Sequence, residues 1–361
     1  MRAPSQTELA GGSIQESSRI HHMMTTASSP GRIVALDYAK GMLVLIMVLY
    51  HWINYFWFAQ DNRYLRFLTP SFIFITGFII SNVYLTKYGV KDPKLFKRLV
   101  ERGLKILALF IGLNVMRSLM LFGKVLWTVP SARPSASSLI EVFTIGTGGG
   151  GGQSKLLAFF ILVPIGYLLI ISAIILGLTR FYRYAVWIIC TLSVLSVIGL
   201  DLFGLQSPNL ELVSIGLLGM IAGSFPIDQV NSFVQHPYWL AVGYLLYLAA
   251  ITVWNVIYPL QIMGVCLSLM IIYLLGQPRS QPGKVTNCIL LLGKYSLFGY
   301  IAQIAVLQIL RRALNNIDSE ALVLVLSFAL GFALTIIAVE AMDRLRAIFR
   351  PVDRVYKAIF A

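Results

Sequence analysis

The chain is poor in charged residues. Only 12% of its 361 residues are Asp, Glu, Lys or Arg, whereas 58% are hydrophobic. Long apolar runs recur with short polar breaks between them, a pattern that no soluble core requires. The scarcity of charge excludes an ordinary soluble domain and predicts an all-α, polytopic integral membrane protein.

Cysteine is also scarce, because the chain holds only Cys190, Cys266 and Cys288. Each lies in or at the edge of an apolar segment, and their spacing fits neither a disulfide framework nor a metal site. Metal-ligand patterns, serine-triad elbows and acidic pairs do not stand out elsewhere in the sequence. We therefore expect no metal cofactor.

Acidic residues are outnumbered, with 15 Asp and Glu against 29 Lys and Arg, for a net charge of +14. We do not interpret this excess as a nucleic-acid signal, because the basic residues gather in particular loops, as membrane topology requires. The first thirty residues are rich in Ser and Thr, with scattered charge and no apolar core. They predict a disordered cytoplasmic tail rather than a cleaved signal peptide.

Hydropathy predicts ten transmembrane helices. They lie near residues 33–57, 67–85, 99–122, 156–178, 184–203, 210–225, 239–256, 260–275, 289–310 and 321–345. The loop after the second span is the most basic, and further Lys and Arg fall on the same side of the membrane. Both termini are therefore expected in the cytoplasm. This divides the chain into the cytoplasmic tail at 1–31, a membrane domain at 32–346 and a basic cytoplasmic tail at 347–361.

A glycine-rich run follows the third predicted span, at 146–152. It resembles a phosphate-binding loop only superficially, because it lacks the Gly-Lys-Ser/Thr ending and does not follow a strand. We interpret it as a flexible outer loop.

Two costly polar groups share the first predicted span. Lys40 and His51 lie eleven positions apart, which returns a helix to within about 20° of the same face and separates them by about 16 Å along its axis. Charged and titratable groups are expensive inside a membrane, so their shared face is a candidate site. Lys40 would lie toward the cytoplasmic end and His51 in the outer half.

Lys40 has two interpretations. It could extend to the lipid headgroups, or pair with Asp37 three residues earlier. Alternatively, Lys40 with Arg32 and the basic second loop, which includes Arg98 and Arg102, would form a cationic pocket at the inner surface. Such a pocket suits an anionic cofactor that carries phosphates.

His51 also has two interpretations. Tyr50, Trp52, Tyr55 and Trp57 surround it in the sequence, much like an aromatic belt at the outer interface. It is also the only histidine within a predicted span, and an imidazole that titrates near neutrality suits a general base that activates a hydroxyl. The residues alone leave both open.

Further polar residues lie within or near the spans. Asn114 and Arg117 are one helical turn apart in the third span and would either pair with another helix or bind substrate. Glu340, with Asp343 and Arg344, would form either an interfacial charge cluster or part of a site.

Five short segments, in order along the chain, form a set of motifs. The segment RIVALDYAKG at 32–41 is followed by an apolar run to the histidine, so that ten residues separate the lysine from the histidine. Two more are FIFITGFII at 72–80 and the basic segment FKRLVER at 96–102. The last two are LGKYSLFGY at 292–300 and AVE at 338–340. Together they resemble the transmembrane acyltransferase clan, and within it the acyltransferase-3 family.

The resemblance runs from residue 32 to about residue 344 and is sparse between the third and ninth spans. The chain departs from the usual pattern in having Lys40 in place of the commoner arginine. It also has Gln303 or a neighbour where the family often has a second histidine. The glucan-succinylating and heparan-acetylating branches are similar too, through the shared Asp-x-x-Lys/Arg-Gly opening.

The resemblance implies acyl transfer across a membrane, with the bacterial plasma (inner) membrane as the expected location. Cytoplasmic acyl-CoA would donate an acetyl or succinyl group to a hydroxyl of an extracytoplasmic glycan or glycolipid of the cell envelope. By matching positions, His51 would be the catalytic base and Lys40 would bind the donor's phosphates. An acyl-histidine intermediate is the alternative. Asn54, Tyr55 and Arg117 are candidates for the oxyanion donor.

The candidate site residues are therefore His51 for catalysis, Lys40, Arg32, Arg98 and Arg102 for the acyl donor, and Asp37, Asn54, Tyr55, Arg117 and Glu340 in support. A transporter or flippase without chemistry is the rival hypothesis, and it predicts an internal repeat of five spans. A structural protein of the envelope is a third, but it leaves the lysine–histidine pair unexplained.

Overall fold

The computed structural model describes residues 33–57, 63–89, 92–125, 141–146, 159–179, 181–182, 184–235, 237–254, 256–277 and 283–360. The chain divides into two units, Met1–Ile33 and Val34–Ala361, and the helices belong to the second. The predicted tail at 1–31, Arg32 and residues 147–152 of the glycine run lie outside the described residues.

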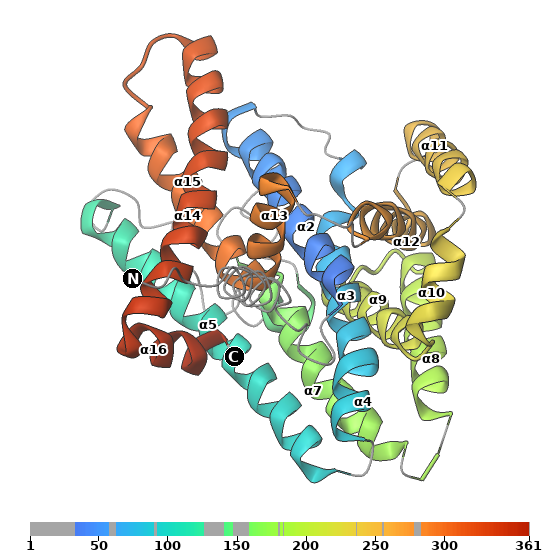
Figure 1. Cartoon of the computed structure of the whole chain (residues 1–361). Coiled ribbons are helices and arrows are strands. Elements are labelled where there is room, and N and C mark those ends of the chain that lie inside the picture. Colours follow the sequence, from blue (N-terminus) through green and yellow to red (C-terminus); the bar gives the residue numbers. More distant parts are fainter. Residues whose placement is uncertain are drawn as a thin grey trace, which may run out of the picture. The chain divides into compact units, whose positions relative to one another are not determined.

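All regular elements formed by these residues are helical, which confirms the all-α class (Figure 1). The α-helices are α2 (Val34–Trp52), α3 (Leu68–Ile79), α4 (Leu85–Tyr88), α5 (Pro93–Val125), α7 (Leu162–Leu178), α8 (Ala185–Leu202), α9 (Pro208–Gly223), α10 (Ile227–Val234), α11 (Pro237–Val253), α12 (Tyr258–Leu275), α13 (Lys284–Lys294), α14 (Ser296–Ala313), α15 (Glu320–Ile348) and α16 (Arg350–Phe360). Two π-helical turns extend α2 and α3, at Ile53–Trp57 and Ile80–Tyr84. A helix thus coincides with each of the ten predicted segments.

The apolar length of these helices makes the chain a multi-pass membrane protein. Five helical segments of the described chain are long and apolar enough to cross a bilayer, and the number rises to seven if each of two bent pairs counts as one span. α7 and α11 are apolar but shorter. The count of ten spans and the cytoplasmic location of both termini stay predictions.

α5 begins earlier than the predicted third span. Asp92 accepts a hydrogen bond from the backbone N–H of Lys94 at 2.8 Å, and Pro93 occupies the first helical position. This is a favourable start for a helix, because proline has no N–H to leave unpaired and a carboxylate stabilises the first turn. The basic residues at 97–102 therefore belong to the first turns of α5, not to a loop.

The predicted span at 289–310 is broken in the structure. α13 and α14 meet at Tyr295 and are bent by 95°. Tyr295 leaves helical geometry there, with φ −109° and ψ 27°. Two tertiary contacts account for the bend, because the backbone of α13 lies directly against α2 and the Tyr295 side chain is bonded to α15. Gly-Lys-Tyr-Ser at 293–296 interrupts the apolar segment, but the sequence alone showed neither contact.

Glycines allow α13 to cross α2 in direct backbone contact. A Cβ on Gly41 would overlap the carbonyl oxygen of Ile289, and a Cβ on Gly293 would overlap the carbonyl oxygen of Asp37. Small residues are the usual means of close helix packing in membranes, where lipid supplies no hydrophobic drive between helices. The first turns of α2 are therefore fixed in place by a helix from the far end of the sequence.

α2 packs against α3, α12, α13, α14 and α15. α14 lies between α2 and α15, since a Cβ on Gly299 would meet Val44 of α2 at 3.2 Å and Val339 of α15 at 3.6 Å. The indole N–H of Trp52 donates to Ser327 of α15 at 2.9 Å, which holds the other end of α2. α13, α14 and α15 thus contact α2 at Gly41, Val44 and Trp52, which are spread along its length.

Candidate active site

Lys40 and His51 both lie on the continuous helix α2, as predicted. The helical rise separates them by about 16 Å along the axis. The ammonium of Lys40 pairs with the Asp37 carboxylate at 2.6 Å, and their side chains are 20% and 13% exposed. This is the local ion pair that the sequence offered as one interpretation of Lys40. It lies at the end of α2 that α13 crosses.

His51 is enclosed by tyrosine rings from α2, from the π-helical turn and from α14. The ring centroids of Tyr50, Tyr55 and Tyr300 lie 5.3, 6.4 and 6.3 Å from that of His51. Its Nε2 atom is buried and has no hydrogen-bond partner among the residues the structure describes. A histidine of an interfacial belt would bring this nitrogen to water or headgroups. The buried nitrogen instead faces the protein interior.

The π-helical turn after α2 is tied to the end of α14. The amide of Gln308 donates to the Tyr55 hydroxyl at 3.3 Å, and the guanidinium of Arg311 lies over the Tyr55 ring at 5.9 Å. The Asn54 amide donates to the backbone carbonyl of Tyr50 at 3.0 Å. Tyr55 therefore lies beside His51, and one donor of Asn54 bonds its own helix.

Gln303 lies on α14, one helical turn beyond Tyr300. Its side chain is fully buried, with 0% exposed. Both its amide nitrogen and its amide oxygen lack hydrogen-bond partners within the described part of the chain. The sequence marked this position only as a departure from a motif and gave it no role. The sequence did contain one signal for this position. Gln303 follows Tyr300, the last residue of the 292–300 motif, by three residues, so the two lie on one side of a helix.

Arg98 and Arg102 are held by tyrosines on the preceding helical segment. Arg98 donates to the hydroxyl of Tyr88, and Arg102 donates to the hydroxyl of Tyr84. The guanidinium of Arg98 also lies over both rings, at 5.6 and 6.0 Å. The described contacts of these two cations are therefore with the end of the second span, and not with Lys40.

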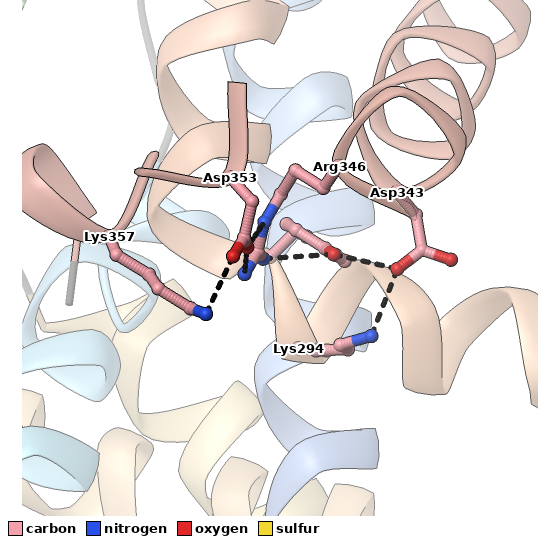
Figure 2. A network of polar contacts seen from close by, with 6 residues as sticks. Lys294, Asp343, Arg346, Asp353 and Lys357 are labelled. Atoms are coloured by element: carbon pink, nitrogen blue, oxygen red, sulfur yellow. Dashed lines mark hydrogen bonds and ion pairs between the residues drawn. The ribbon is translucent and has the colours of Figure 1, made fainter. Parts of the chain in front are cut away.

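A network of six polar residues joins the α13–α14 junction to α15 and α16 (Figure 2). Asp343 accepts from the Lys294 ammonium at 2.9 Å and from the Tyr295 hydroxyl at 2.6 Å. Arg346 donates to that same hydroxyl at 3.0 Å. Lys294 follows Gly293, whose backbone lies against Asp37. The network therefore adjoins the Lys40 end of α2.

The other half of the network fastens α16. The Arg346 guanidinium bonds the Asp353 carboxylate at 2.7 and 3.0 Å, and the Lys357 ammonium bonds it at 2.6 Å (Figure 2). Hydrogen bonds from Lys357 and Arg346 hold the pKa of Asp353 below its usual value of 3.8. Arg346 also stacks on the ring of Tyr356 at 4.0 Å. The sequence did not anticipate this cluster.

The Tyr356 side chain on α16 is influenced by cations from two parts of the chain. Burial raises the pKa of the Tyr356 phenol to about 12, and the nearby cations Arg346 and Arg102 oppose that rise. Arg102 is thus close enough to α16 for its charge to act there. The sequence predicted only that the second loop and the C-terminal segment lie on one side of the membrane. In the structure, one cation from each, Arg102 and Arg346, lowers the pKa of the same side chain, Tyr356.

The other predicted site residues are placed as follows. Glu340 forms an exposed ion pair with Arg344 at 2.5 Å, one turn along α15, which is the surface cluster that the sequence offered as one interpretation. Arg117 belongs to α5, but its side chain lies outside the described residues, as does Arg32. Among the described residues, no group of three or more His, Cys, Asp or Glu side chains could hold a metal ion.

The helices and their apolar lengths define a multi-pass membrane protein with a buried histidine on its first helix. The acyltransferase domain of the acyltransferase-3 family matches residues 33–340. The chain therefore belongs to the acyltransferase-3 family, as its motifs indicated, and is a membrane acyltransferase. No curated protein and no solved structure matches the chain.

Proposed function

We propose that this acyltransferase takes an acetyl or succinyl group from acyl-CoA in the cytoplasm and transfers it to a hydroxyl of an extracytoplasmic glycan or glycolipid. The plasma membrane of a bacterium is the proposed location. The observation that carries the proposal is α2, which bears a cation near one end and a buried, unpartnered imidazole nitrogen near the other. Their separation of about 16 Å matches a donor that enters from one side and reacts deep in the membrane.

The proposed donor site lies at the Lys40 end of α2. Acyl-CoA carries several phosphate charges, which Lys and Arg side chains bind well. Lys40 is 20% exposed, so its ammonium can contact a ligand while it remains beside Asp37. Arg102 and Lys294 supply further positive charge around α13 and α16. Arg32 and Arg98 complete the proposed set of donor-binding cations. The extended pantetheine arm would then run along the α2 face toward His51.

The proposed chemistry takes place at His51. The acceptor oxygen attacks the thioester carbon, and Nε2 of His51 takes the hydroxyl proton as the new carbon–oxygen bond forms. When the tetrahedral intermediate collapses, the carbon–sulfur bond breaks and the same proton passes to the departing CoA sulfur. The aromatic rings around His51 exclude bulk water from this step. An acyl-histidine intermediate is the alternative route, with the same residue as nucleophile.

The test uses membranes that contain the full-length protein, supplied with radiolabelled acetyl-CoA or succinyl-CoA. Transfer of label to the glycan and lipid fractions is expected with wild type. It is expected to fall to background with His51→Ala, a loss of at least about 100-fold. His236→Ala, which removes a histidine outside the predicted spans, is the matched control and should transfer normally. Full transfer by His51→Ala would overturn the catalytic role.

A transporter or flippase remains the alternative outcome of the same experiment. In that case wild type transfers no label from either donor, and purified protein binds neither acetyl-CoA nor succinyl-CoA. If the protein binds acyl-CoA but transfers no label, the proposed donor is supported and the proposed acceptor is wrong.

A further inference from the structure

Gln303 is a buried amide for which the described fold supplies no partner. Its side chain is 0% exposed, and neither its nitrogen nor its oxygen has a hydrogen-bond partner among the described residues. Buried side-chain amides are almost always bonded, and inside a membrane no bulk water is available to compensate. An amide left open at such a place is typical of a site that a ligand completes.

The position of Gln303 along α14 brings it to the level of the candidate site. α14 runs alongside α2 in the same direction. Gly299 lies against Val44. Nine residues further along α14, Gln308 bonds Tyr55, which follows Val44 by eleven residues in the π-helical turn that extends α2. Tyr300 lies against His51, with 6.3 Å between ring centroids. Gln303 follows Tyr300 by one helical turn and therefore falls within the stretch of α14 that flanks His51.

Two unpartnered polar groups thus lie on neighbouring helices. One is Nε2 of His51, which can accept a proton, and the other is the Gln303 amide, which can donate two hydrogen bonds and accept others. Both are buried, so each waits for a partner that the described chain does not provide. A carbonyl that becomes an oxyanion next to a base needs such a donor.

We propose that Gln303 is a catalytic residue that donates an amide hydrogen bond to the carbonyl oxygen of the acyl group during transfer. This assignment rests on the proposed acyl transfer at His51. When the acceptor oxygen attacks the carbonyl carbon, the π electrons of the carbonyl move onto the carbonyl oxygen. The Gln303 N–H stabilises the negative charge that develops on this oxygen. Return of the electrons re-forms the carbonyl and expels the CoA sulfur, which takes the proton held by His51.

The other candidates for this task already have described partners. One N–H of the Asn54 amide donates to the Tyr50 carbonyl at 3.0 Å. The Tyr55 hydroxyl accepts from the Gln308 amide at 3.3 Å, which ties this side chain to α14 although its O–H can still donate. Gln303 is distinguished from both because its amide is fully buried and without a described partner.

The experiment compares wild type with Gln303→Met, which keeps the length of the side chain and removes the amide. We measure the label transfer rate from acetyl-CoA in membranes at saturating donor, the Kd of acetyl-CoA for purified protein, and the melting temperature. The transfer rate is expected to fall about 100-fold. The donor Kd should stay within about threefold of wild type, and the melting temperature should be unchanged or raised, because an unpaired buried amide is removed.

Gln261→Met on α12 is the matched control, since it makes the same exchange in a half-buried residue and is expected to leave all three quantities unchanged. A Gln303→Met variant that transfers at the wild-type rate would overturn the assignment. A lowered melting temperature together with an unchanged rate would also do so, since it would show a structural role. If Gln303→Met does not fold, Gln303→Asn replaces it. Shortening the side chain by one methylene withdraws the donor, and the rate should fall at least about tenfold; an unchanged rate would overturn the proposal.

The design separates this assignment from the proposed function. When wild type transfers label and His51→Ala does not, a normal rate in Gln303→Met rejects only the role of Gln303. When wild type transfers no label, the proposed function fails, and the assignment of Gln303 fails with it.

Discussion

At the scale of single residues, the ion pair between Lys40 and Asp37 is the feature that needs a functional explanation. Both side chains are mostly buried in a membrane helix, where each charge is expensive to keep even when paired. A purely structural pair would be replaceable by apolar residues at little cost. The Lys40–Asp37 pair lies toward the opposite end of α2 from His51, and we propose that Lys40 also binds the acyl donor there.

Lys40→Ala is expected to weaken binding of acetyl-CoA to purified protein by about tenfold, because one phosphate-binding cation is lost. The transfer rate at saturating donor should change little, since the substitution does not touch the reacting atoms. Lys40→Arg, which keeps the charge, is the control and should bind nearly normally. A lower saturated rate with unchanged Kd would contradict the assignment.

Gly41 makes a second prediction at this scale. Gly41→Ala is expected to destabilise the protein by about 1–3 kcal/mol, because its Cβ would overlap the carbonyl of Ile289 and force α13 away from α2. Thermal unfolding measures this change. Gly199→Ala on α8 is the matched control, as a Cβ there has open space around it, and alanine should be neutral or slightly stabilising in a helix. Equal melting temperatures for the two variants would contradict the close contact.

The sequence located residues near the site better than it described their contacts. The spacing of Lys40 and His51 follows from helical periodicity alone, so their shared helix could be predicted. The open amide of Gln303 could not, because whether a buried polar group finds a partner depends on helices distant in the sequence. The tyrosine partners of Arg98 and Arg102 are only 10 and 18 residues away, but they depend on how the chain folds back between the second span and α5.

At the scale of elements, the helix boundaries divide into those that local sequence sets and those that packing sets. The start of α5 follows from Asp92 and Pro93, and is readable locally. The bend at Tyr295 is not, because it depends on contacts with α2 and α15 that come from the rest of the chain. The hydropathy of 289–310 is apolar on average despite Gly-Lys-Tyr-Ser at 293–296, and this average is the same for a bent pair and for a straight span.

α16 is an element whose attachment should depend on pH. Ion pairing lowers the pKa of Asp353, so its contacts stabilise the docked helix above the usual carboxyl value and are lost as pH falls through the lowered value. Hydrogen exchange of the α16 amides, corrected for the intrinsic pH dependence, should therefore show a docked helix at pH 7 and release only below pH 3.8. Asp353→Asn should exchange faster than wild type at pH 7.

Comparison of wild type with Asp353→Asn at low pH tests whether Asp353 acts through its charge. Wild type and Asp353→Asn should converge as pH falls below 3.8, because protonation removes the same charge that the substitution removes. A difference that persists undiminished at pH 3 would show that Asp353 acts through something other than its charge. A substitution of Arg354, which is exposed on α16, serves as a control for the general effect of altering that helix.

At the scale of the whole molecule, membrane sidedness gives the proposed reaction its direction. The described helices support five to seven spans, and basic loops predict cytoplasmic termini. α15 has 29 residues and is apolar enough to cross the bilayer alone. Its two ends should therefore lie on opposite sides of the membrane, with α16 in the cytoplasm and the α14–α15 connection outside.

Sidedness can be measured with single cysteines introduced at Asp318 and at Ala358 in a variant without the three native cysteines. A membrane-impermeant maleimide added to intact cells should label the first position and spare the second until the cells are opened. Both positions are exposed in the structure, so neither is hidden by packing. Labelling of Ala358→Cys in intact cells would reverse the predicted orientation and with it the side from which the donor enters.

The crossing of α2 by α13 also has a consequence for the biogenesis of this protein. Asp37 and Gly293 are in backbone contact. During translation, however, more than two hundred residues are added between them. α2 is therefore synthesised long before α13, and Gly41 and the Lys40–Asp37 end of the helix lack this covering partner for most of translation.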